Sequence, residues 1–271
     1  MTDGLVFGVT LSADDKTHRE ALGTLSELLS ADSGLAVETH NLRRPNLLAR
    51  ALAMGDVDIG WLSPTLLLMD PGLSHVVPLL SSVRQGAAAF HALLFSSTRL
   101  DAESIDELHG AHVAWVAPSS AAGYLVPRLS LSRRGYDLGD LFAEETFYDT
   151  HGKVARAVLR GKADVGATYG HFAGGSADMG KLMSAGFMEH GPFASVRVLD
   201  VSGPIPADMI VVRPEVPIPE RIAFAAALSR LAHDPVGGEP LRRVIGAEDF
   251  RAVTTEALSE LQSLMQAAQD V

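Results

Sequence analysis

The sequence predicts an α/β protein whose sheets are mostly parallel and flanked by helices. Strand-like and helix-like patterns alternate from the N-terminus to Leu80. The alternation restarts at Ala89, and a chain of 271 residues is long enough for one large domain or for two lobes. Regular alternation of this kind is typical of parallel sheets with helices on both faces.

The first part of the chain predicts four strands, at residues 5–10, 36–41, 57–62 and 75–80. Apolar residues at helical spacing predict a helix from Asp14 or Asp15 to about Gly34, and another over residues 46–54. Pro64 is expected at a helix start, where its missing N–H costs nothing. Ligands of such sheets bind beyond the carboxyl ends of strands, so the candidate binding residues here are Thr10, Ser63 and Thr65.

The second part predicts strands at residues 89–96, 112–116, 144–148, 165–168, 196–201 and 209–213. Helices are expected at 104–109, after Ser120 and at 151–160, and from Pro219 onwards at 222–233, 248–253 and 256–267. Most of the Gly-rich residues 170–180 are expected to form a mobile surface loop, with the start of the segment, beside a strand end, as the exception, and Pro204 and Pro206 are expected to form a turn.

Composition excludes several classes of function. A net charge of −11 argues against a nucleic-acid partner, and no apolar run approaches the roughly 20 residues that span a bilayer. The chain has no cysteine, and its ten histidines include no His-x-His or His-Glu-x-x-His, so neither a metal nor a cofactor is expected. The N-terminus as written shows no signal peptide, which predicts a cytoplasmic protein, or a periplasmic one if a leader has been removed.

The most informative stretch is residues 113–127, where a strand, two serines and a helical pattern follow one another. Such a turn directs free backbone N–H groups and the positive end of the helix dipole at one point, which suits a phosphonate, phosphate or carboxylate. Ser119 and Ser120 are therefore candidate ligand contacts. Capping of the helix without any ligand is the more common role of such serines, and both interpretations stay open at this point.

Several motifs in order resemble the phosphonate/phosphite-type substrate-binding proteins of ABC transporters. They are Gly55-Asp-Val-Asp-Ile-Gly-Trp-Leu-Ser-Pro64, Glu107-Leu-His-Gly110, Pro118-Ser-Ser-Ala-Ala-Gly-Tyr124 with Pro127, Tyr148-Asp-Thr-His151 and Gly161-Lys-Ala-Asp-Val-Gly-Ala167. The resemblance implies the two-lobed type II periplasmic-binding-protein fold, with two strands crossing near residues 90–96 and 209–213. Lobe one would contain residues 1–88 and 214–271, and lobe two residues 89–213.

The resemblance also implies which residues bind the ligand. Where the family has Ser-Thr-Ser-Gly around the phosphonate, this chain has Ser120-Ala121-Ala122-Gly123, so two hydroxyl donors are missing. The family's Gly-Ser-His corresponds to Asp149-Thr150-His151, which keeps a hydroxyl and the histidine but adds a carboxylate. We therefore expect weak phosphonate binding. The aromatic residues that could stack on a planar ligand are Trp61, Phe90, Tyr124 and Tyr169.

The leading hypothesis is a solute-binding protein that closes two lobes on a small polar or anionic molecule. It would work with an ABC transporter permease or, without an export signal, as a cytoplasmic sensor or carrier with a signalling partner. The alternative is a cytoplasmic enzyme of the same fold in menaquinone or thiamine-precursor biosynthesis. A third possibility is a ligand-regulated interaction module. Ser119 or Ser120 with His151 could form a nucleophile and base, but no Gly-x-Ser-x-Gly turn is present and catalysis is not expected.

Overall fold

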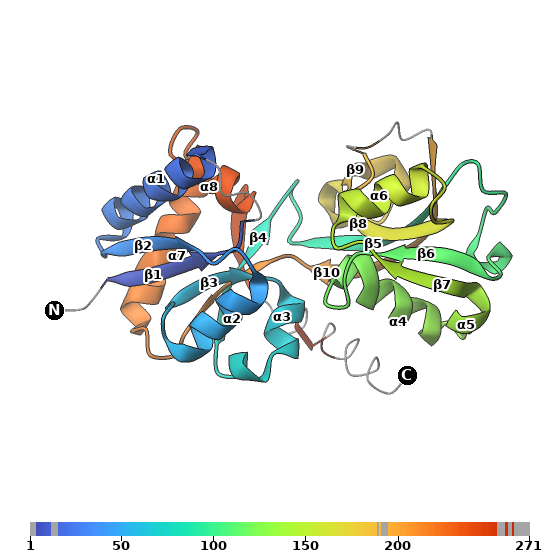
Figure 1. The fold of residues 1–271 in the computed structure, drawn as a ribbon. Helices are drawn as coiled ribbons and strands as arrows, with labels where there is room; N and C mark the ends of the chain where they lie inside the picture. Colours follow the sequence, from blue (N-terminus) through green and yellow to red (C-terminus); the bar gives the residue numbers. More distant parts are fainter. Residues whose placement is uncertain are drawn as a thin grey trace. The chain divides into compact units, whose positions relative to one another are not determined.

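The computed structural model describes residues 4–11, 16–188, 190, 195–253, 258–259 and 262. The chain divides into two compact units. The first comprises Met1–Ala88 and Pro206–Leu258, and the second Ala89–Ile205 and Ser259–Val271. Each unit is an α/β structure built on its own sheet, which confirms the predicted fold class (Figure 1).

The first unit is built on a six-stranded mixed sheet. Its strand order is β12-β4-β11-β3-β1-β2, and β1 pairs in parallel with β2 and β3. The other three strands pair antiparallel, so the sheet is mixed where we expected it to be mostly parallel. The strands are β1 (Leu5–Val9), β2 (Val37–Asn41), β3 (Ile59–Leu62), β4 (Val77–Val83), β11 (Met209–Val212) and β12 (Asp249–Ala252).

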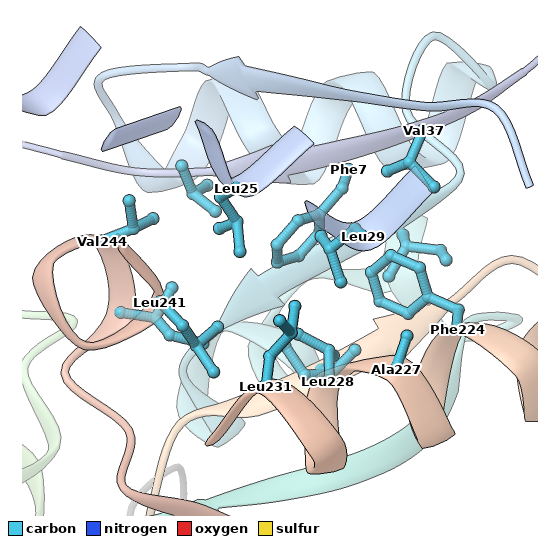
Figure 2. Packing of buried hydrophobic residues seen from close by; sticks show 14 of the residues in the cluster. Phe7, Leu25, Leu29, Val37, Phe224, Ala227, Leu228, Leu231, Leu241 and Val244 are labelled. Carbon is cyan, nitrogen blue, oxygen red and sulfur yellow. The ribbon is translucent and has the colours of Figure 1, made fainter. Parts of the chain in front are cut away.

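Helices cover both faces of this sheet. One face is packed by α1 (Lys16–Ser33), α7 (Ile218–His233) and α8 (Gly238–Ile245), and the other by α2 (Pro45–Met54), α3 (Pro64–Met69) and the 3-10 turn η1 (Pro71–Leu73) (Figure 1). Side chains alternate along the strands, and Phe7 therefore points to the α1 and α7 side, where its ring meets that of Phe224 at 5.3 Å (Figure 2).

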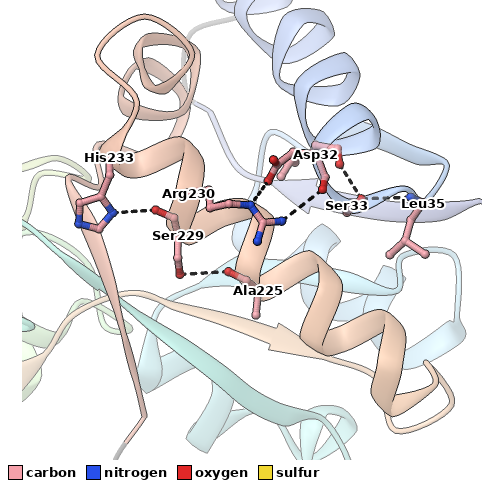
Figure 3. A network of polar contacts seen from close by, with 8 residues as sticks. Asp32, Ser33, Leu35, Ala225, Ser229, Arg230 and His233 are labelled. Atoms are coloured by element: carbon pink, nitrogen blue, oxygen red, sulfur yellow. Dashed lines mark hydrogen bonds and ion pairs between the residues drawn. The ribbon is translucent and has the colours of Figure 1, made fainter.

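Polar contacts join α7 to the end of α1. Arg230 Nε donates to Asp32 Oδ2 at 2.8 Å, and its Nη2 donates to the Asp32 carbonyl at 3.2 Å (Figure 3). The hydroxyl of Ser33 accepts from the Leu35 amide at 3.2 Å, just beyond the helix end. These contacts hold the turn that leads into β2, the edge strand of the sheet.

The second unit also has a mixed sheet, of order β10-β5-β8-β6-β7 with β9 beside β8. Helix α6 (His151–Leu159) packs on one face, and α4 (Val126–Arg133) with α5 (Leu138–Leu141) packs on the other. The strands are β5 (Ala89–Ser97), β6 (Ala111–Trp115), β7 (Phe142–Phe147), β8 (Val165–Phe172), β9 (Leu182–Ala185) and β10 (Val196–Pro206). Short helical turns are η2 (Ile105–Glu107), η3 (Ala121–Leu125), η4 (Ala173–Gly175) and η5 (Met179–Lys181).

Several boundaries differ from those expected. Residues 248–253 contain strand β12 where we predicted a helix, because pairing with β4 outweighs a weak local pattern in which only Phe250 is buried. Helix α8 was missed, since Pro240 lies in its first turn, where proline is tolerated but resembles a loop residue. The helix expected at 104–109 is only the turn η2, and strand β8 continues to Phe172, beyond the strand expected at 165–168. Asp14, Asp15 and most of the helix expected at 256–267 lie outside the described residues.

The second connection between the units also lies earlier than the resemblance implied. Strand β11 pairs with β3 and β4 inside the first sheet, and the contacts of residues 206–213 belong to the first unit. The expected turn at Pro204 and Pro206 is part of β10. Among the described helices, none combines the length and the apolar character needed to cross a membrane.

Candidate ligand-binding site

The turn after β6 brings Ser120 to the start of a helix. The Val116 amide donates to the Gly123 carbonyl at 3.0 Å, and the Ser120 amide donates to the Ala117 carbonyl at 2.9 Å. Ser120 Oγ accepts from the Gly123 amide at 3.1 Å, so the serine caps turn η3. Ser119, one residue earlier, is exposed. The first N–H groups of a helix lack partners within it, which leaves donors for a ligand at this turn.

An apolar cluster lies directly beside this helix start. Its buried members are Ala92, Ala122, Val126 and Ile205, and its partly exposed members are Phe90, Ala121 and Tyr169. Ala122 is only 2% exposed, so its methyl group belongs to this cluster. The two alanines that stand for the family's hydroxyl residues therefore have different surroundings, and only Ala121 is partly open.

His151 is held at the start of α6 by two neighbours. Thr150 Oγ1 accepts from the Lys153 amide at 3.3 Å and caps the helix. His151 Nδ1 is 3.0 Å from Thr168 Oγ1, and its ring meets the edge of Tyr169 at 5.0 Å. Burial lowers the pKa of His151 from 6.5 to about 4. The imidazole is therefore neutral at pH 7 and can recognise a ligand by a hydrogen bond but not by charge.

Gly186 allows the chain to pass close to this histidine. A Cβ at residue 186 would lie 2.2 Å from Thr168 Oγ1 and 3.0 Å from the His151 Cβ. We expect Gly186→Ala to lower the free energy of unfolding by about 1–3 kcal/mol, because overpacking forces these side chains apart. Gly23→Ala is the matched control, since nothing lies within 4 Å of the added carbon. Chemical denaturation of both variants measures the difference, and equal stabilities would contradict the tight contact.

Aromatic side chains continue from His151 along β8. Tyr169 and His171 lie two residues apart on one strand face, with ring centroids 5.5 Å apart, and His171 lies 5.7 Å from Phe90. His171 was missed by the sequence analysis, although its alternation with Tyr169 is a signal that could have found it. The group offers flat surfaces beside the helix start.

Asp149 carries the carboxylate that distinguishes this chain from the family motif. Its Oδ2 lies 2.8 Å from Lys153 Nζ, and its side chain is 79% exposed. Its φ of 66° is in the left-handed region, at the sharp turn between β7 and α6. The carboxylate is thus engaged with an exposed lysine, which reduces its repulsion of an anion at the start of α6.

The first unit carries a cavity of about 220 Å³ at the carboxyl ends of β1 and β3. Thr10, Ser63 and Trp61 line it together with Asp208, which the sequence analysis missed. Ser63 Oγ accepts from the Leu66 amide and lies 3.1 Å from Thr65 Oγ1. Thr65 is 1% exposed, so it supports Ser63 and has little surface of its own for a ligand.

Arg84 forms an ion pair with Asp208, which lines this cavity. Its Nη2 lies 3.3 Å from Asp208 Oδ2, and its Cζ lies 5.7 Å from the centre of the Trp61 ring. Arg84 and Asp208 are 124 residues apart in sequence, which is why no local pattern pointed to the pair. The pair has little net charge, and the carboxylate of Asp208 can still accept a hydrogen bond.

Tyr124 belongs to a different group of side chains from Phe90 and Tyr169. Its ring packs at 5.5 Å from Trp115 and 5.1 Å from Phe147, and Arg128 Cζ lies 5.2 Å from its centre.

In the described part of the chain, no three His, Cys, Asp or Glu side chains gather as a metal site would require.

Comparison with known proteins places the chain in a family. The family described as "ABC transporter, phosphonate, periplasmic substrate-binding protein" matches residues 7–258. The chain belongs to this family. The resemblance seen in its motifs is thereby confirmed, and the chain is a relative of the receptors of ABC transporters.

Solved structures agree on the fold of this phosphonate-type binding protein. XAC2383 from Xanthomonas citri, in a structure bound to ATP, is 23% identical with a TM-score of 0.77 over 98% of each chain. PhnD1 from Prochlorococcus marinus, in complex with methylphosphonate, is 12% identical with a TM-score of 0.72 over 98% of each chain. A binding protein of an ABC phosphonate transporter, PA3383 from Pseudomonas aeruginosa, is 17% identical with a TM-score of 0.72, and the match covers 98% of this chain and 87% of that one.

Proposed function

We propose that this phosphonate-type binding protein is the solute receptor of an ABC transporter and that its ligand is a polar or anionic molecule with a planar part. The observation that carries the proposal is the apolar cluster of Phe90, Ala121, Ala122 and Tyr169 beside the capped helix start at Ser120. The helix start suits one anionic group, and the rings suit a flat body. Binding without chemistry follows the family, whose described role is substrate binding.

The phosphonate group itself is expected to bind weakly. A buried oxyanion needs donors for nearly all its oxygens, and unmatched ones are costly. Neutral His151 supplies at most one N–H, and the hydroxyls of the family motif are absent at Ala121 and Ala122. A carboxylate, or a phosphonate joined to an aromatic group, fits the side chains better.

Residues of the first unit are proposed to take part as well. The cavity of Thr10, Trp61, Ser63 and Asp208 offers an aromatic ring, two hydroxyl groups and a carboxylate acceptor. Because Arg84 pairs with Asp208, this cavity favours a neutral donor such as a hydroxyl or amide N–H over a bare ammonium group. Closing of two lobes on the ligand stays a prediction, which small-angle X-ray scattering with and without ligand would test.

Isothermal titration calorimetry with methylphosphonate, phenylphosphonate and benzoate tests the proposal. We expect phenylphosphonate to bind at least about tenfold more tightly than methylphosphonate, since stacking on an aromatic ring contributes about 0.5–1.5 kcal/mol beyond burial of its area. Tyr169→Ala should remove most of that preference. Micromolar binding of methylphosphonate with no preference for the phenyl compound would refute the proposal.

A pair of alanine variants tests the missing donors. Ala121→Ser adds a hydroxyl at a partly open position and should raise methylphosphonate affinity by roughly ten- to hundredfold, as one hydrogen bond to a charged group provides. Ala122→Ser adds the same group inside the apolar cluster, so it should lower stability and leave the affinity unchanged. Calorimetry and thermal unfolding distinguish the two. A gain in affinity from Ala122→Ser alone would contradict this assignment.

A further inference from the structure

A basic cavity lies on the second unit, on the exposed side of α6. It has a volume of about 170 Å³ and is lined by Tyr148, Lys153, Arg156, Ala157, Arg160 and Lys162. Four of these six side chains are cationic and none is acidic, although the chain as a whole has a net charge of −11. Two of the four lysines in the sequence gather here. The charge of this surface is therefore opposite to that of the protein.

Helix stability alone does not explain the cluster. Arg156 and Arg160 lie in the last turn and at the C-cap of α6, where cations favour the helix dipole, but as like charges four residues apart they repel each other. Lys153 lies in the first turn, at the positive end of the dipole, where a cation is unfavourable. Among the described residues, only Asp149, at 2.8 Å, compensates it. The positions of these cations on α6 are therefore electrostatically unfavourable for the helix.

The cations retain donors for a ligand. Within the part of the chain that the structure describes, the side chains of Arg160 and Lys162 have no hydrogen bond or ion pair. Among these described residues, Arg156 Nη1 has only a long contact of 3.5 Å with His190 Nδ1. Guanidinium groups bind phosphate oxygens in pairs, and lysines add point charges. The buried methyl group of Ala157 and the half-buried ring of Tyr148 complete the lining.

We propose that this cavity binds a phosphate-class oxyanion. Its volume is below the roughly 300–1,000 Å³ of pockets for drug-sized ligands, so it suits a single phosphate group and not a nucleotide. The site is separate from the proposed solute site, because His151 contacts Thr168 and Tyr169 whereas the cavity uses the exposed side chains of the same helix. The phosphate could be a free ion or part of a lipid headgroup, since the two present the same oxyanion.

Titration of ¹⁵N-labelled protein with inorganic phosphate at low ionic strength tests the site. We expect saturable shifts of the amide signals of Ala157, Arg160 and Lys162, which weaken as NaCl is raised because salt screens exposed charges. Arg160→Gln with Lys162→Gln should lower this affinity at least tenfold. The matched control, Arg50→Gln with Lys16→Gln, removes the same charge from exposed residues of the first unit and should leave the affinity unchanged.

Vesicle sedimentation distinguishes the two sources of phosphate. Binding to phosphatidylglycerol vesicles but not to phosphatidylcholine vesicles, lost in the double variant, would assign the site to a lipid headgroup. Phosphate-induced shifts without vesicle binding would assign it to the free ion. The proposal is overturned if 50 mM phosphate produces no saturable shift around α6 and vesicles do not bind, or if the double variant and the parent respond equally.

Discussion

Replacing Phe224 by Ala is expected to lower the free energy of unfolding of the first unit by about 3–5 kcal/mol. The side chain is fully buried on α7, and its ring packs edge-on against Phe7 of β1 at 5.3 Å. The surrounding side chains come from α1, α7 and the sheet, so they cannot close the cavity that the truncation would leave (Figure 2).

The same helix supplies the control for this prediction. Ile222 is 63% exposed, so Ile222→Ala should change stability by less than about 0.5 kcal/mol. The chain has two tryptophans, Trp61 in the first unit and Trp115 in the second, and Trp115→Phe leaves a fluorescence signal specific to the first unit. Denaturant titrations in that background would compare both variants. Similar midpoints for the two would show that α7 is not part of the core.

Acidification is expected to destabilise the second unit through His151. Because the pKa of this histidine is lowered from 6.5 to about 4, the unfolded chain binds more protons between these two pH values. The stability contributed by the neutral imidazole is fully present above pH 6.5 and is lost as the pH falls towards 4, by about 3 kcal/mol in total. Burial also lowers the pKa of His91, which adds a contribution of the same sign.

Urea denaturation at pH 4.5, 5.5 and 7 measures this dependence. His151→Gln removes the titrating group and should flatten the curve, although the slope due to His91 remains. His75→Gln replaces an exposed histidine and should keep the parent's curve. A parent and a His151→Gln variant with identical pH dependence would mean that the imidazole is as well hydrated in the folded protein as in the unfolded one.

The sequence by itself determined the α/β class and most of the elements. Period-2 and period-3.6 patterns are local, and strands such as β1 and helices such as α2 satisfy them with few competing contacts. The ordered series of motifs also determined the family, because each motif marks a strand end or a helix start of one fold. Among the site residues, Ser63, Ser120 and Thr150 each occupy the helix start that their position in the sequence predicted.

Only the tertiary structure decided the chemistry of the site. Arg84 forms an ion pair with Asp208, which lies 124 residues away in sequence, and burial keeps His151 uncharged. Packing places the methyl group of Ala122 in the apolar cluster, whereas Ala121 stays partly open. Strand β12 likewise exists because β4 pairs with it. Each of these features depends on which residues, distant in sequence, come into contact and on how far water is excluded from them. Local residue spacing does not encode such contacts, because charge state and strand pairing depend on the surroundings of a residue.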